Sequence, residues 1–134
     1  NAFGEELIIE NAEDALEKVC QRTGAEIVDY TAAPIFMSGK DKGAHEWIME
    51  FKTPPENLEY FNELFDNALK SLNSDYEAKR FNNMTLNKPQ IHVARPRLFY
   101  DWLKANDKLG GQHKVPRLSN TREYVEALLE LNHS

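Results

Sequence analysis

The sequence predicts one α+β domain, in which a sheet of about four strands carries helices on both faces. Three observations support this fold class. Apolar residues recur at helical spacing in several stretches of the 134-residue chain. Other short stretches are rich in Ile, Val, Tyr and Trp, which favour strands. Capping residues, prolines and glycines separate these stretches and mark the ends of the elements.

The first half of the chain is expected to begin with a strand, a helix and a second strand. The apolar run that ends residues 5–9 predicts the first strand. Asn11 is expected to cap a helix that Gly24 ends. Residues 25–37 favour the second strand, in which Pro34 requires an edge or a bulge because it donates no hydrogen bond.

The third strand is marked by strict alternation. Its two sets of alternating residues are Trp47, Met49 and Phe51 on one side and Glu46, Ile48 and Glu50 on the other. This pattern predicts one buried face and one mostly solvated face. The glycine-bounded turn at residues 38–43 predicts that the second and third strands form a hairpin.

The second half predicts one more strand and four more helices. These are expected at residues 56–72, 74–80, 90–94 (the strand), 98–106 and, after a cap at Asn120, up to Leu131. The resulting order β-α-β-β-α-β, followed by two C-terminal helices, is that of ferredoxin-like split βαβ domains. We expect the two long helices to cover one sheet face and the two C-terminal helices the other.

Composition restricts the function classes. Asp and Glu number 22 against 16 Lys and Arg, so the net charge of −6 argues against a general nucleic-acid binder. Cys20 is the only cysteine, which excludes an internal disulfide and a multi-cysteine metal site, and we predict no metal site. No membrane-length apolar stretch occurs, and the cytosol is the expected compartment. Asn1 in place of Met suggests a piece of a longer chain.

The strongest candidate for chemistry is the loop at residues 108–119. It carries Gly110 and Gly111, which let a backbone approach a ligand closely, followed by Gln112 and the permanent cations Lys114 and Arg117. Such a loop suits a phosphate or a carboxylate. A solvated connector between two helices is the alternative, and the glycine spacing is not that of a P-loop.

Tyr76, Lys79 and Arg80 form a second candidate, because Tyr76 and Arg80 share a helix face and Lys79 lies beside them. A contact to an acyl or phosphate group is one interpretation. A surface ion pair with Asp75 or Glu77 is the other. The four histidines are too scattered in the sequence to indicate a metal site.

Four segments together resemble a known family. They are residues 1–7, 44–47, 72–80 and 108–120. In order and spacing they are similar to the C-terminal region of the auxin-responsive promoter family of acyl acid–amido synthetases, within the adenylate-forming superfamily. The form Lys114-Val115-Pro116-Arg117 resembles bacterial members, whereas plant members usually have Thr where this chain has Val115.

The resemblance implies a two-step reaction, in which ATP adenylates a carboxylic acid and an amino acid then displaces AMP to form an amide. ATP and Mg²⁺ would be bound mainly by an N-terminal adenylation domain of the same polypeptide. Residues 1–134 would be the single mobile domain that closes over that site, with the hinge upstream of residue 1. No nucleic-acid or membrane partner is implied, and this piece alone would be inactive.

The resemblance also assigns roles to residues. Lys114 would lie near the reacting carboxylate and the α-phosphate, where its ammonium would stabilise growing negative charge. Gly110, Gly111, Gln112 and Arg117 would contact the substrate or nucleotide. Two further groups would have supporting roles: Gly4 and Glu5 near the hinge, and Tyr76, Lys79 and Arg80 beside the site. The alternative function is a free-standing ferredoxin-like module that binds a small ligand or another protein.

Overall fold

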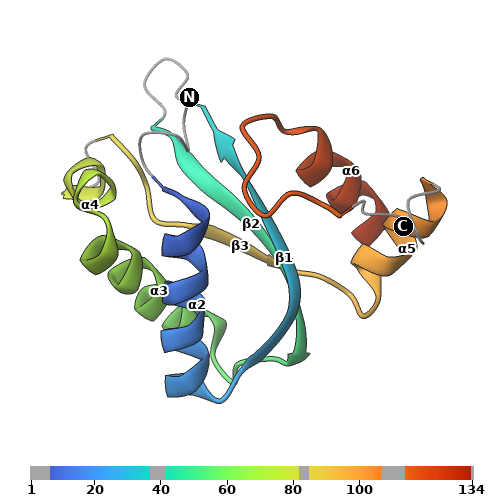
Figure 1. Ribbon diagram of the computed structural model, residues 1–134, viewed down its shortest axis with the longest axis horizontal. Coiled ribbons are helices and arrows are strands. Elements are labelled where there is room, and N and C mark those ends of the chain that lie inside the picture. Colours follow the sequence, from blue (N-terminus) through green and yellow to red (C-terminus); the bar gives the residue numbers. More distant parts are fainter. Residues whose placement is uncertain (1–6, 37–41, 82–84, 107–113, 134) are drawn as a thin grey trace.

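The computed structural model describes residues 7–36, 42–81, 85–106 and 114–133. In these ranges the chain forms helices and a mixed sheet, which confirms the α+β class and the two extra helices at the C-terminal end (Figure 1). The elements are α2 (Ile9–Thr23), β1 (Glu26–Ile35), β2 (Ala44–Thr53), α3 (Leu58–Leu72), α4 (Ser74–Arg80), β3 (Gln90–Val93), α5 (Leu98–Ala105) and α6 (Glu123–Asn132).

The described sheet has three strands in the order β1-β2-β3. The antiparallel pair β1 and β2 is the predicted hairpin, with Ile35 opposite Ala44 at its closed end. β3 runs parallel to β2 and begins beside Glu46. β1 is therefore an edge strand, and Pro34 lies on it as the sequence requires.

The strand order differs from a ferredoxin-like sheet in one respect. In that arrangement the first strand lies between the third and the last. Here β3, which is the last of the four expected strands, pairs directly with β2, which is the third. Of the strand expected at residues 5–9, Leu7 and Ile8 lie outside any strand and Ile9 already begins α2. Leu7 is only 2% exposed, so the apolar run joins the core from a loop and a helix start instead.

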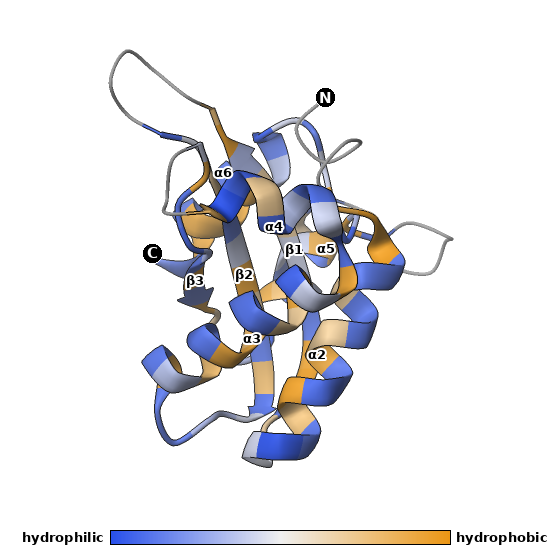
Figure 2. Ribbon diagram, turned by 90° about the vertical axis from the view of Figure 1, so that its left-hand side faces the viewer, coloured by the Kyte–Doolittle hydropathy of each residue, from blue (hydrophilic) through white to orange (hydrophobic). Residues whose placement is uncertain are grey.

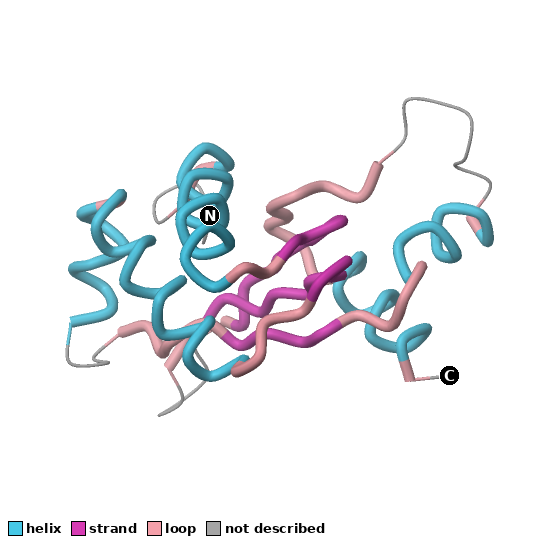
Figure 3. The backbone as a smooth tube through the Cα atoms, turned by 90° about the horizontal axis from the view of Figure 1, so that it is seen from below, coloured by secondary structure: helices cyan, strands magenta, loops and turns pink. Residues whose placement is uncertain are grey.

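Helices cover both faces of the sheet (Figure 3). α2 and α3 pack side by side on one face (Figure 2). Their buried apolar residues belong to the same core cluster as residues of β1 and β2. Trp47, Phe61 and Phe65 lie in the large core cluster on this face. α5 and α6 lie on the other face, where Ile48, Leu98 and Val125 belong to a second cluster.

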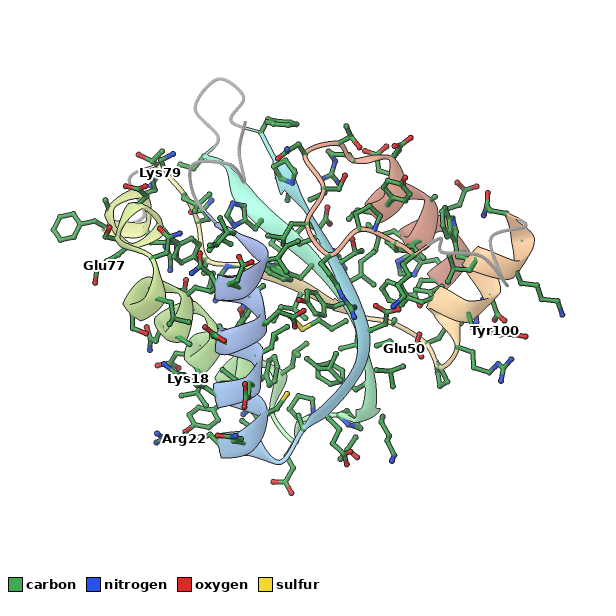
Figure 4. The ribbon with its side chains drawn as sticks, viewed as in Figure 1. Lys18, Arg22, Glu50, Glu77, Lys79 and Tyr100 are labelled. Atoms are coloured by element: carbon green, nitrogen blue, oxygen red, sulfur yellow. The ribbon has the colours of Figure 1, made fainter. Side chains whose placement is uncertain are left out.

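The predicted solvated face of β2 is therefore wrong, because α5 and α6 cover it. Glu46 and Glu50 are each only 7% exposed, and both carboxylates have partners that compensate their burial. Glu50 accepts the backbone N–H groups of Arg97 and Phe99 at the start of α5, at 3.3 and 3.2 Å. Figure 4 shows Glu50 between the sheet and that helix. An anion at a helix N-terminus is a favourable arrangement.

Several helices begin one or more residues from the expected cap. α2 starts after Ile8, and the Asn11 side chain reaches back to accept the Ile8 N–H at 3.1 Å. α3 is capped by Asn57 and α4 by Asn73, each through its side-chain oxygen. Gly24 ends α2 in the left-handed conformation, as predicted, with φ of 80°.

None of the helices in the described ranges is long and apolar enough to cross a membrane.

Candidate functional site at the edge of β1

The described end of the cationic loop runs alongside β1 and extends the sheet. We call residues 114–119 the lysine segment. The Ala32 N–H donates to the Arg117 carbonyl at 3.0 Å, and the Ser119 N–H donates to the Ala32 carbonyl at 2.9 Å. The Thr31 hydroxyl adds a 2.6 Å hydrogen bond to the Pro116 carbonyl. These bonds pair the segment with the free edge of β1, so its described part is a strand-like extension and not a solvated connector.

Arg117 fixes the segment to β1 through its side chain. Its guanidinium pairs with the Asp29 carboxylate and lies over the Tyr30 ring, 4.6 Å from the ring centroid. About a third of each side chain in the ion pair remains exposed. Burial raises the pKa of Asp29, and the charges of Arg117 and Lys114 oppose that rise. Arg117 is therefore an anchor of the segment, and its charge is already engaged by a carboxylate.

Lys114 is exposed, and it forms no ion pair within 4 Å among the described residues. Its ammonium acts on Asp29 through space. The next residue, Val115, is only 5% exposed and packs in the core cluster beneath α5 and α6. A buried apolar side chain at this position explains why Val, which offers no hydroxyl, suits this chain. The segment thus turns Val115 inward and leaves Lys114 outside.

A second ion cluster holds the chain that follows the lysine segment. Arg122 donates to the Pro34 carbonyl at 2.8 Å and to the Glu46 carboxylate at 2.6 Å. The other Glu46 oxygen contacts the His92 ring at 2.6 Å. Burial alone would raise the pKa of Glu46, but hydrogen bonds from Arg122 and His92 together hold it below its usual value of 4.5. β1, β2, β3 and α6 are thereby tied together behind the segment.

The second candidate group has a different setting. Tyr76 and Arg80 are 1% and 7% exposed, and both bind Asp66 of α3. The Tyr76 hydroxyl donates at 2.6 Å, and Arg80 donates from Nε at 2.9 Å and from Nη2 at 2.5 Å. The principal partner of Arg80 is therefore Asp66, and not Asp75 or Glu77 as in the expected surface ion pair. Arg80 also donates to the Leu86 carbonyl at 3.1 Å, which ties α4 to the chain leading into β3.

This buried cluster lies on the α3 and α4 side of the molecule, away from α6 and the lysine segment (Figure 1). Figure 4 shows Glu77 and Lys79 on the outer side of α4. The structure thus does not bring Tyr76 and Arg80 into the site that contains Lys114. Their geometry is that of a clamp between α3 and α4, and any support they give to Lys114 stays a prediction.

Five of the residues proposed for the site cannot be placed. Gly110, Gly111 and Gln112 lie outside the described residues, and so do Gly4 and Glu5 near the proposed hinge. Within the described ranges, no group of three or more His, Cys, Asp or Glu side chains is arranged to hold a metal ion.

The anchors of the lysine segment could not be predicted from the sequence. Asp29 is 88 residues from Arg117, and Glu46 is 76 residues from Arg122. Neither carboxylate carries a local signal that names its partner. One signal was present in the sequence: Asp29, Glu46 and Glu50 lie within expected strands. A carboxylate that is buried in a strand requires a cation or hydrogen-bond donors nearby.

The fold and the site together define a class: a small α+β domain that presents a lysine from an edge segment tied to its sheet. Residues 10–123 match the family model described as GH3 family C-terminal domain. The chain belongs to that family. A comparison with curated proteins found no match.

Solved structures support the same fold. One is described as "GH3.15 acyl acid amido synthetase", with a TM-score of 0.70 at 20% identity over 94% of this chain. Another, described as "AtGH3.15 acyl acid amido synthetase in complex with 2,4-DB", has a TM-score of 0.64 at 18% identity over 92% of this chain. The chain spans 24% and 23% of those two chains, so it resembles about a quarter of each.

Proposed function

We propose that this chain is the C-terminal lid of an ATP-dependent acyl acid–amido synthetase, and that Lys114 is its catalytic residue. One observation carries the proposal: in a member of this family, the lysine segment is fixed to β1 by backbone hydrogen bonds and leaves the Lys114 ammonium exposed. A cation that the domain does not neutralise internally is available to a partner that binds a nucleotide.

The role of Lys114 follows from the charge that develops during adenylation. When a carboxylate attacks the α-phosphate of ATP, negative charge grows on the phosphoryl oxygens and on the departing pyrophosphate. A compact ammonium at the end of a flexible stem stabilises such charge as a point cation. Because the lysine segment is anchored, the reorganisation needed to place that charge is small.

The partner is an N-terminal adenylation domain of the same polypeptide, joined by a hinge upstream of residue 1. ATP and Mg²⁺ are held mainly there, where the metal neutralises phosphate charge. The C-terminal domain, residues 1–134, contributes Lys114 and excludes water from the acyl adenylate when it closes over that site. Gly110, Gly111 and Gln112 complete the contact with substrate or nucleotide. An amino acid then accepts the acyl group as an amide, in the cytoplasm.

The test uses full-length protein that contains this chain, ATP, and a panel of small carboxylic acids. Pyrophosphate release is measured for the unaltered protein and for Lys114→Ala. We expect the substitution to lower the rate by about a hundredfold or more, the range seen when one preorganised charge-stabilising group is removed. The free energy of unfolding of the domain should not change measurably, because Lys114 is exposed.

Lys18→Ala is the matched control. Lys18 is exposed on the outer side of α2 and points away from the sheet (Figure 4). Its removal takes away the same charge without touching the lysine segment, so pyrophosphate release should stay within about twofold. Equal rates for Lys114→Ala and Lys18→Ala would remove Lys114 from the mechanism.

A further inference from the structure

Asp29 lies directly after an irregularity in β1. In the pairing of β1 with β2, the two steps from Ile27 to Asp29 face a single step on β2, so Val28 is an extra residue. Ile27 and Tyr30 both pack in the core cluster beside α2, although residues three apart in a regular strand face opposite sides. A bulge of this kind changes the direction of the side chains that follow it. It therefore sets the position from which Asp29 reaches the lysine segment.

The Asp29 carboxylate is oriented by its own strand and in turn fixes the Arg117 side chain. Its Oδ1 atom accepts the Tyr30 N–H at 2.9 Å, and the same oxygen accepts a hydrogen bond from Arg117. Arg117 also donates to the Tyr30 carbonyl at 3.4 Å and lies over the Tyr30 ring. A planar guanidinium with these three contacts has little freedom to rotate. The backbone of Arg117 is held separately, because its carbonyl accepts the Ala32 N–H.

The residues between Lys114 and Arg117 have two further attachments. The Thr31 hydroxyl donates to the Pro116 carbonyl at 2.6 Å. The Val115 side chain is buried in the core cluster beneath α5 and α6. Lys114 comes directly before these anchored residues and is itself exposed. Its location therefore depends on how residues 115–117 are held against β1.

The charge of Asp29 acts on both cations of the segment. Burial raises the pKa of Asp29, and the charges of Arg117 and Lys114 oppose that rise. Arg117 pairs with the carboxylate directly, whereas Lys114 interacts with it through space. If the carboxylate were neutral, Arg117 would lose its partner, would repel Lys114, and would compete with it for the same phosphate. Asp29 thus keeps one cation on the protein and leaves the other for a ligand.

We propose that Asp29 is a positioning residue for Lys114: its negative charge holds Arg117 against β1, so that the lysine segment presents the Lys114 ammonium from one fixed place. Asp29 acts through Arg117 and does not itself contact the reacting groups. Its role in adenylation rests on the proposed function of Lys114, whereas its hold on the lysine segment can be measured without catalysis.

The first experiment measures pyrophosphate release by full-length protein that contains this chain. Asp29→Asn keeps the size of the side chain and the oxygen that accepts the Tyr30 N–H, but it removes the charge. We expect kcat to fall by about tenfold and KM for ATP to stay within about twofold, because a misplaced group slows the chemical step even where the substrate still binds.

Glu26→Gln is the matched control. Glu26 is an exposed carboxylate of the same strand and accepts a hydrogen bond from Thr53 on β2. Its substitution removes the same charge without altering a contact of the lysine segment, so kcat should stay within about twofold. An equal fall in kcat for Asp29→Asn and Glu26→Gln would reduce the effect to net charge and overturn the proposal.

A kinetic double-mutant cycle separates positioning from a general loss of structure. If Asp29 acts through Lys114, then Asp29→Asn should slow the Lys114→Ala protein by less than about twofold, because the group to be positioned is absent. A structural defect would instead multiply the loss caused by Lys114→Ala. Full multiplication of the two losses, or an unchanged kcat for Asp29→Asn beside a slowed Lys114→Ala, would contradict the proposal.

Hydrogen–deuterium exchange of the same full-length proteins measures the hold on the lysine segment. In Asp29→Asn, peptides that cover residues 114–119 should exchange about twofold to fivefold faster, the effect of losing a partly solvated ion pair. The β1–β2 hairpin should keep its exchange rate, and so should both segments in Glu26→Gln. Unchanged exchange of residues 114–119 in Asp29→Asn would overturn the proposal whatever the rates show. If Lys114→Ala left pyrophosphate release unchanged, the proposed function and the part of Asp29 in adenylation would fall together, and faster exchange would support the anchoring alone.

Discussion

Two arginine clusters in this domain look alike in the sequence and behave differently in the structure. Arg80 and its partner Asp66 are each 7% exposed, and a tyrosine hydroxyl and a backbone carbonyl complete the cluster. Arg117 and Asp29 are 35% and 30% exposed, and an uncompensated lysine lies three residues before Arg117. In the first cluster, Arg80 is fully paired and joins α4 to α3. In the second, Arg117 anchors the segment that carries the exposed Lys114.

A cationic motif does not by itself indicate a ligand site. What separates the two clusters is whether a charge remains after the internal carboxylates have been paired. Around Arg80 the charges balance within the buried cluster. At the edge of β1, Asp29 is paired with Arg117, and Lys114 remains exposed.

The largest expected effect is on stability at the buried cluster. Arg80→Ala leaves Asp66 buried beside Tyr76 without its principal cation, so the free energy of unfolding should fall by about 3–5 kcal/mol. Denaturant unfolding measures this loss. Lys70→Ala is the control, because the partly exposed Lys70 ammonium lies 3.5 Å from the same carboxylate. Its loss should lower the free energy of unfolding by only about 0.5 kcal/mol. Equal losses in the two variants would refute the distinction.

The buried carboxylates should also give the domain an acid limit. Burial alone would raise the pKa of Asp66, but hydrogen bonds from Arg80 and Tyr76 together hold it below its usual value of 3.8. Glu46 is likewise lowered from 4.5. Because both folded-state pKa values lie below the unfolded ones, their stabilisation is complete above about pH 4.5 and declines as pH falls further. Unfolding measured from pH 7 to 3 checks this.

Glu46→Gln should remove part of this pH dependence, since the amide does not titrate. A free energy of unfolding that rose as the pH fell below 4.5 would contradict the assignment of lowered pKa values.

A smaller effect is expected at the exposed cluster. Asp29 and Arg117 should couple by about 1 kcal/mol in a double-mutant cycle with Asp29→Asn and Arg117→Ala, because their pair is partly solvated. The cycle is measured by denaturant unfolding in low and high salt, and the coupling should decrease in high salt. A coupling as large as that expected for Arg80 and Asp66 would mean that the two clusters are alike.

Features that depend on residues close together in the sequence could be predicted, and features that depend on distant residues could not. The hairpin, the left-handed Gly24 and α4 were predicted, because each rests on residues close together in the chain. The direct pairing of β2 with β3 was missed, since parallel pairing of distant strands leaves no local pattern. For the same reason α5 and α6 were not recognised as enough cover to bury Glu46 and Glu50.

The candidate site shows the same division. The sequence located the cationic loop and named Lys114 and Arg117. It did not indicate that Arg117 is ion-paired whereas Lys114 is exposed, because the partner of Arg117, Asp29, lies 88 residues away in the sequence.

The central claim is that Lys114 is presented by a segment held against β1, and amide hydrogen exchange tests it most directly. The Ala32 and Ser119 amides are the donors that join the segment to the strand. We expect both to be protected as strongly as the amides of the β1–β2 hairpin. Exchange of these two amides at the rate of an unstructured peptide, with the hairpin still protected, would show that the segment is not anchored.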